Sequence, residues 1–140
     1  MPIERTLVMI KPDAVSKNAI GNIVGRFEKA GFTILALKVK KLSIDEAKNF
    51  YFVHRERPFY DSLTKFMSSG KMVAIALEGE NAIPRVRDMM GPTDSKKAAP
   101  GSIRGDLGTD IEKNAVHGSD SPESANIELP FFFSGLELVK

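Results

Sequence analysis

The chain has 140 residues, with 20 basic and 18 acidic side chains, so its formal net charge is only +2. This length predicts a single domain over residues 1–140, and so small a net charge excludes binding to nucleic acid or to membranes by bulk electrostatics alone. The sequence has no cysteine, which excludes disulfides, thiolate catalysis and cysteine-ligated metals.

The first third of the chain predicts two strands around a helix. Residues 6–10 are apolar in both alternating sets, as in a central strand. Residues 20–31 carry apolar side chains at helical spacing. Residues 33–42 alternate, with Leu37 and Val39 on the face opposite the lysines, which is typical of a half-exposed edge strand.

Two helices are predicted next. A capping box, Ser43-x-x-Glu46, opens the first, which carries Tyr51 and His54 on one stripe. We interpret His54 as structural. After a break, residues 59–67 predict a second short helix.

The second half predicts the remaining elements. Residues 72–77 form another strand that is apolar on both faces, and residues 81–90 form a helix. Residues 91–113 show no periodicity, and a long stretch of that kind in a small domain is usually functional. A short strand at residues 115–116 and a last helix over residues 122–133 complete the chain.

This order of elements predicts an α/β fold, more closely an α+β sandwich. We expect a ferredoxin-like, four-stranded antiparallel sheet with helices packed on one side and a long loop near residues 91–113. The glycine patterns of a Rossmann fold and of a P-loop are both absent, so a nucleotide must be held in another way.

The segment from Asn114 to Ser121 is the most informative part of the sequence. It reads Asn-Ala-Val-His-Gly-Ser-Asp-Ser, with His117 among small and polar residues just before a predicted helix. A histidine side chain is largely neutral near pH 7 and can attack an acyl or phosphoryl centre. A nucleophilic role for His117 is therefore one interpretation, and a merely structural histidine is the other.

This segment resembles the active-site signature of the nucleoside diphosphate kinases. Further family-like motifs occur in order along nearly the whole chain, and they are Lys-Pro-Asp-Ala-Val at 11–15, Arg-Pro-Phe at 57–59, Leu-Glu-Gly-Glu-Asn-Ala at 77–82 and Pro-Gly-Ser-Ile-Arg-Gly-Asp at 100–106. The resemblance implies a ping-pong reaction, in which His117 accepts the γ-phosphate of a nucleoside triphosphate and passes it to a nucleoside diphosphate.

The resemblance also implies roles for ten further residues. Lys11, Arg87 and Arg104 would bind phosphate, with Lys11 also contacting a sugar hydroxyl. Thr93 would offer its hydroxyl to the β-phosphate, and the Tyr51 hydroxyl would reach toward His117.

The nucleoside itself would be held by apolar and amide contacts. Phe59 would stack on the base, Ile111 would pack on its other side, and Asn114 would bind the sugar hydroxyl. Glu128, supported by Ser119, would accept a hydrogen bond from the imidazole nitrogen that does not attack.

One departure from the family pattern concerns the last helix. Pro130 falls inside it, where a proline removes a backbone hydrogen bond and favours a kink. A kink there would displace the Glu128 carboxylate.

Cofactor and partners follow from the same resemblance. Mg²⁺ is expected to arrive with the nucleotide, without a protein ligand, since no acidic cluster could form a cage for it. The expected partners are nucleoside tri- and diphosphates and further copies of the chain, with residues 33–42 as a dimer surface. The short segment after Phe133 favours a tetramer over a hexamer or dimer. No membrane and no nucleic acid is required.

The N-terminal 20 residues include charged side chains that a secretory signal peptide would not carry, which predicts a cytoplasmic protein.

Two alternative functions stay open. One is a ferredoxin-like module that binds nucleotide or RNA without turnover, although residues 6–10 and 72–77 lack the aromatic side chains that RNA-binding sheets use. The other is a catalytically inactive scaffold.

Overall fold

The computed structural model describes residues 2–140, and its centre is a four-stranded sheet. The strand order is β2-β3-β1-β4 and every neighbouring pair is antiparallel. This is the predicted ferredoxin-like arrangement, with the two strands that are apolar on both faces at the centre. The strands are β1 (Ile3–Ile10), β2 (Thr33–Lys40), β3 (Met72–Glu80) and β4 (Val116–Gly118).

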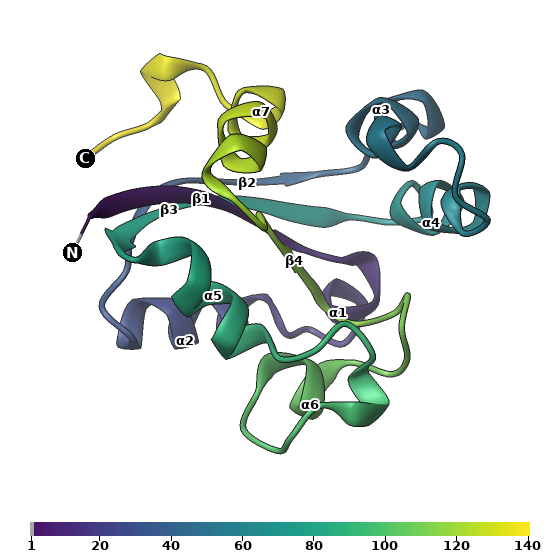
Figure 1. The fold of residues 1–140 in the computed structure, drawn as a ribbon, viewed down its shortest axis with the longest axis horizontal. Coiled ribbons are helices and arrows are strands. Elements are labelled where there is room, and N and C mark those ends of the chain that lie inside the picture. Colours follow the sequence, from purple (N-terminus) through teal and green to yellow (C-terminus); the bar gives the residue numbers. More distant parts are fainter. Residues whose placement is uncertain (1) are drawn as a thin grey trace.

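Helices cover both faces of this sheet (Figure 1). One face packs against α2 (Ile20–Lys29) and α5 (Ala82–Met90). The other packs against α3 (Ile44–Phe50), α4 (Tyr60–Met67) and α7 (Pro122–Phe132).

The prediction that helices pack on one side only is therefore wrong. The physical reason lies in β1, where Val8 and Ile10 enter one apolar cluster while Leu7 and Met9 enter the other. A strand that is apolar on both faces must have both faces covered.

Five shorter elements join these parts. The segment 91–113, predicted to be structureless, contains two short helices, η2 (Ser95–Lys97) and α6 (Ile103–Leu107), which are too brief to show a helical period. The five elements are α1 (Pro12–Ser16), η1 (Phe52–His54), η2 (Ser95–Lys97), α6 (Ile103–Leu107) and η3 (Gly135–Glu137).

The edge strand β2 departs from strict alternation. Its register on β3 shifts between Ile34 and Ala36. Leu35 is buried, whereas Leu37 and Val39 are 43% and 54% exposed. The edge of the sheet therefore presents apolar side chains to solvent.

The two strands that carry the principal site lie side by side. Met9 of β1 pairs with His117 of β4, and Ile10 pairs with Val116. Lys11, directly after β1, is thereby brought next to the start of β4, where its backbone N–H bonds to the Ala115 carbonyl at 2.8 Å.

Within residues 2–140 no helix has both the length and the apolar character needed to cross a membrane.

Candidate active site

A pocket of about 550 Å³ gathers nearly all the residues that the sequence suggested for a site. It lies where β1, β4, α5, α7, the α3–α4 pair and the segment 91–113 meet. Ten of the eleven predicted residues line it, and these are Lys11, Tyr51, Phe59, Arg87, Thr93, Arg104, Ile111, Asn114, His117 and Glu128.

His117 is held through one ring nitrogen. Its Nε2 lies 2.8 Å from Oε1 of Glu128, to which it can donate a hydrogen bond. No residue within 2–140 is hydrogen-bonded to Nδ1. The rings of Phe50 and Tyr51 meet the imidazole edge to face, at centroid distances of 5.6 and 6.3 Å. In the tautomer with Nε2–H, Nδ1 carries the lone pair, and the ring is fixed while that nitrogen stays available to attack.

Ser119 is the predicted residue that does not line the pocket. It is fully buried behind Glu128, to which its hydroxyl donates a hydrogen bond at 2.8 Å, and the same hydroxyl accepts the Leu7 backbone N–H at 3.2 Å. Ser119 thus ties the Glu128 carboxylate to β1. It acts on the pocket only through Glu128.

The carboxylate of Glu128 is not displaced by the nearby proline. Pro130 lies inside α7, as expected, two residues after Glu128. The carboxylate nevertheless holds both His117 and Ser119 at 2.8 Å. The expected displacement is therefore absent from this structure.

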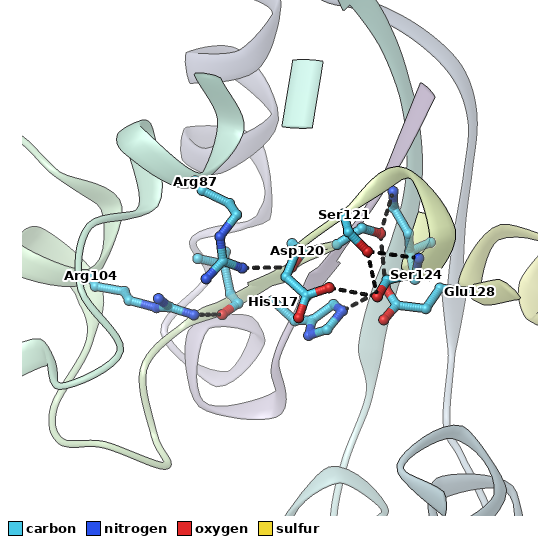
Figure 2. Close-up of polar contacts among 11 residues, drawn as sticks. Arg87, Arg104, His117, Asp120, Ser121, Ser124 and Glu128 are labelled. Carbon is cyan, nitrogen blue, oxygen red and sulfur yellow. Dashed lines mark hydrogen bonds and ion pairs between the residues drawn. The ribbon is translucent and has the colours of Figure 1, made fainter. Parts of the chain in front are cut away.

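Two arginines are fixed by backbone carbonyls on the other side of His117 from Glu128 (Figure 2). Arg104 is buried and donates to the carbonyls of Gly91 at 3.0 Å and Val116 at 2.9 Å. Arg87 donates to the carbonyl of Gly118 at 3.2 Å. Within residues 2–140 neither guanidinium forms an ion pair within 4.0 Å. Their positive charges are therefore free to attract an anion.

Burial and mutual repulsion act on the cations of the pocket. Burial, and then the charge of Arg87, lower the pKa of Arg104 to about 10. Burial, and then the charge of Arg104, lower the pKa of Lys11 to about 8. The nearest polar partner of the Lys11 ammonium is the Glu112 carbonyl, 3.5 Å from Nζ. An anionic ligand would relieve the repulsion between these side chains.

Tyr51 presents an unused hydroxyl group. The residue is buried, and its hydroxyl has no hydrogen-bond partner within residues 2–140. Burial, together with the negative charge of Glu128, raises its pKa. The hydroxyl therefore stays protonated and can donate a hydrogen bond to a ligand.

Asn114 joins the segment 91–113 to the pocket. Its amide nitrogen donates to the carbonyls of Thr93 at 2.9 Å and Ile111 at 3.2 Å, whereas its buried Oδ1 has no partner within residues 2–140. This oxygen is available to accept a hydrogen bond from a hydroxyl group.

Two apolar side chains belong to the outer part of the pocket. Phe59 is 45% exposed and Ile111 is 64% exposed. Exposed apolar side chains in a pocket wall suit a flat aromatic ligand. Thr93 is also exposed and presents its hydroxyl there.

Sequence reasoning missed several pocket residues. His54, interpreted as structural, lines the pocket with its ring centroid 5.4 Å from that of Phe59. Its place on the same stripe as Tyr51 was the available signal. Phe50 and Glu112 also line the pocket, and no pattern in the sequence pointed to them. Asp120 lines it too, and it lies in the segment from Asn114 to Ser121 that the sequence singled out.

The acidic side chains near the pocket do not form a metal cage. Within residues 2–140 no three histidine, aspartate or glutamate side chains are grouped closely enough to hold a metal ion. A divalent cation that came with an anionic ligand would take oxygen ligands from that ligand and from water.

Comparisons with known proteins identify relatives of this chain. The family model described as nucleoside diphosphate kinase matches residues 4–138. The nucleoside diphosphate kinase of Aquifex aeolicus is 57% identical, over 99% of this chain and 100% of that protein. That of Persephonella marina is 54% identical over the full length of both.

Solved structures agree with this relation. A crystal structure of the Aquifex aeolicus nucleoside diphosphate kinase superposes with a TM-score of 0.97, covering 99% of this chain and 100% of that one. The halophilic nucleoside diphosphate kinase of Halobacterium salinarum, solved in complex with CDP, is 41% identical, with a TM-score of 0.95 over 99% of this chain and 93% of the other.

Proposed function

This chain belongs to the nucleoside diphosphate kinase family and is a phosphotransferase that acts between nucleoside triphosphates and nucleoside diphosphates, and we propose that His117 carries the phosphate between them. The observation that supports this role is the pairing of Nε2 with Glu128, which leaves Nδ1 without a partner among residues 2–140. The two alternatives, a binding module without turnover and an inactive scaffold, are not favoured.

In the first half-reaction, the lone pair of Nδ1 attacks the γ-phosphorus. The bond between that phosphorus and the oxygen bridging to the β-phosphate breaks, and the diphosphate leaves with the electron pair. The phosphorylated imidazole carries positive charge, which the Glu128 carboxylate stabilises through Nε2–H. In the second half-reaction, a terminal oxygen of another nucleoside diphosphate attacks the same phosphorus. The bond between that phosphorus and Nδ1 breaks, its electron pair returns to the nitrogen, and His117 is regenerated.

The cations supply most of the catalytic stabilisation. Lys11, Arg87 and Arg104 bind the phosphate oxygens, and Tyr51 and Thr93 donate hydroxyl hydrogen bonds to them. A phosphoryl transfer demands mainly positioning and neutralisation of charge. These cations are held by backbone carbonyls, and Lys11 and Arg104 are also buried, so they provide both with little rearrangement.

Phe59 and Ile111 enclose the base, and Asn114 accepts a hydrogen bond from the sugar through Oδ1. Stacking and apolar contact do not read the edge of a base. The pocket should therefore accept nucleotides with different bases.

We propose Mg²⁺ as the cofactor, delivered with the nucleotide. When bound, it would supply Lewis-acid neutralisation of the phosphate oxygens. The donor set fits this mode, because the pocket offers three cations for phosphate and, within residues 2–140, no protein cage for a metal. No protein ligand to the ion is proposed.

Several wider properties are part of the same proposal. Residues 1–140 form one kinase domain. The exposed Leu37 and Val39 on the edge strand β2 support self-association, and we favour a tetramer over a hexamer or dimer. The enzyme works in the cytoplasm, where its nucleotide substrates are made and used. Sedimentation of the purified protein tests the tetramer.

The decisive experiment is transfer of label from γ-labelled nucleoside triphosphate with Mg²⁺ to the protein. We expect a label that is stable in base and lost in acid, as for a phosphohistidine, and we expect none on His117→Ala. His54→Ala is the matched control, because it removes the only other histidine of the chain, and it should still be labelled. Label retained by His117→Ala would refute the assignment.

A further inference from the structure

The backbone two residues before His117 adopts a strained conformation. Ala115 has a φ of +72°, in the region that residues with a Cβ avoid. The Val116 N–H donates to the Asn114 carbonyl at 2.8 Å, which closes a three-residue turn around Ala115. A γ-turn with positive φ is the rare and strained form. Such a conformation persists only where its surroundings enforce it.

The junction between β1 and α1 holds both sides of this residue. The Ala115 N–H donates to Oδ2 of Asp13 at 3.0 Å. The Ala115 carbonyl accepts the Lys11 backbone N–H at 2.8 Å. The bond to Asp13 is the one made by a side chain, and a carboxylate acceptor strengthens such a hydrogen bond when it is ionised.

Asp13 lies outside the pocket lining, and its one effect on the pocket is electrostatic, since its negative charge opposes the fall in the pKa of Lys11. Its other oxygen, Oδ1, is buried without a partner within residues 2–140. Burial raises the pKa of its carboxyl group, against the opposing effect of the Ala115 hydrogen bond. A partly unsatisfied carboxylate under the site is energetically costly, and the Ala115 turn is the contact that it serves.

We infer that Asp13 is a positioning residue for phosphoryl transfer, which holds the strained turn at Ala115 and thereby sets the direction in which His117 enters the pocket. This inference rests on the proposed role of His117. The turn lies where the chain enters β4, a strand of only three residues with His117 at its centre. A relaxed Ala115 would change the path of the chain immediately before the nucleophile.

Two of the neighbouring ligand-binding groups, Asn114 and Arg104, have anchors that do not involve Ala115. Asn114 is tied to the carbonyls of Thr93 and Ile111, and Arg104 keeps its bond to the carbonyl of Gly91. Loss of Asp13 should therefore disturb the alignment of the imidazole more than the binding of nucleotide. The expected signature is a fall in the rate of the chemical step with little change in KM.

The test uses Asp13→Ala, Asp13→Asn, Ala115→Gly and the double variant Asp13→Ala/Ala115→Gly in the full chain. Single-turnover labelling of His117 at saturating nucleotide measures the chemical step. We expect Asp13→Ala to slow it by about tenfold or more, since small misplacements of reacting groups have effects of this order. Asp13→Asn retains an oxygen that accepts the Ala115 N–H, and it should keep most of the rate.

The double variant separates positioning from a general loss of structure. Glycine adopts a positive φ without the steric cost of a Cβ, so Ala115→Gly should restore most of the rate lost in Asp13→Ala. If Asp13→Ala does not fold, Asp13→Ser replaces it, because its shorter side chain falls short of the Ala115 N–H.

Two results would overturn the inference. One is a wild-type rate of labelling in Asp13→Ala. The other is a slow rate in Asp13→Ala that the added Ala115→Gly substitution leaves unchanged. Failure of the proposed function looks different, because the wild-type protein itself would then carry no label.

Discussion

The carboxylate of Glu128 lies 2.8 Å from Nε2 of His117, and the same oxygen accepts the Ser119 hydroxyl at the same distance. A residue of α7 thus orients an imidazole on β4 from behind. The pair is not deeply buried, since both side chains keep about a fifth of their surface exposed. If His117 is phosphorylated as proposed, the charge that the imidazole gains would be met by an adjacent carboxylate that is already held in place.

Glu128→Gln should lower kcat far more than it changes KM for nucleotide. The amide preserves the shape of the side chain but removes the negative charge that stabilises the phosphorylated imidazole. Loss of such an orienting partner typically costs about 10- to 100-fold in activity. Steady-state kinetics with ATP and a second diphosphate measure the effect. Glu123→Gln is the control, on an exposed site of the same helix, and equal losses in both variants would contradict the role of Glu128.

The pH dependence should reveal Lys11. Its pKa is lowered to about 8 by burial and by Arg104, so the ammonium is charged below this pH and neutral above it. Loss of that charge removes one phosphate-binding cation, and kcat/KM, which reports on the free enzyme, should fall by about tenfold per pH unit above the pKa. Lys11→Arg, which stays protonated, should show no such decline. A wild-type profile that stays flat through this range would exclude the role.

The central strands could be predicted because their signal is local and strong. Residues 7–10 and 72–77 are apolar throughout, and they lie within β1 and β3. The same apolar runs also indicate that both faces of the sheet are covered. The prediction that helices pack on one side only therefore disagreed with the sequence pattern itself. The order of elements along the chain was sufficient to predict the ferredoxin-like topology that the structure shows.

Other features arise only from packing between distant segments. The register shift between Ile34 and Ala36, which breaks the alternation of β2, leaves no mark in the local pattern. The helices η2 and α6 are too short for a period to emerge. Phe50 reaches His117 only because α3 packs on the same face as α7, and no motif indicates this.

The site was predicted in greater detail than the fold because its residues sit in motifs. His117 and Asn114 belong to one continuous segment, and the structure brings them together with Lys11 from the opposite end of the chain. Spacing alone could not reveal that Ser119 reaches the site only through Glu128. That contact depends on where α7 crosses β1.

Phe59→Ala should weaken the binding of every nucleotide to a similar degree. The phenyl ring offers a stacking surface that does not distinguish bases, and one such contact contributes about 1–3 kcal/mol. Because the ring is 45% exposed, we expect the lower end of this range, as an increase in KM for ADP, GDP, CDP and UDP alike. Phe52→Ala is the control, since this exposed phenylalanine stacks on Arg55 and does not line the pocket. An effect restricted to purines or to one base would contradict the stacking role.

Gly105→Ala should damage both stability and activity through the segment that holds Arg104. A Cβ on Gly105 would collide with the Ala99 carbonyl oxygen, a backbone atom that cannot move without displacing the turn before α6. Forced shifts of this kind cost about 1–3 kcal/mol, so the melting temperature should drop, and KM for nucleotide should rise as Arg104 is displaced. Gly25→Ala is the matched control, because Gly25 is an exposed position inside α2 where an added Cβ meets nothing within 4 Å. Alanine is the better helix former by about 0.5–1 kcal/mol, so Gly25→Ala should raise the melting temperature and leave KM unchanged. A Gly105→Ala protein with wild-type stability and KM would show that the segment 91–113 adapts to the added carbon, and that the fixed backbone around Arg104 is not needed to hold the phosphate.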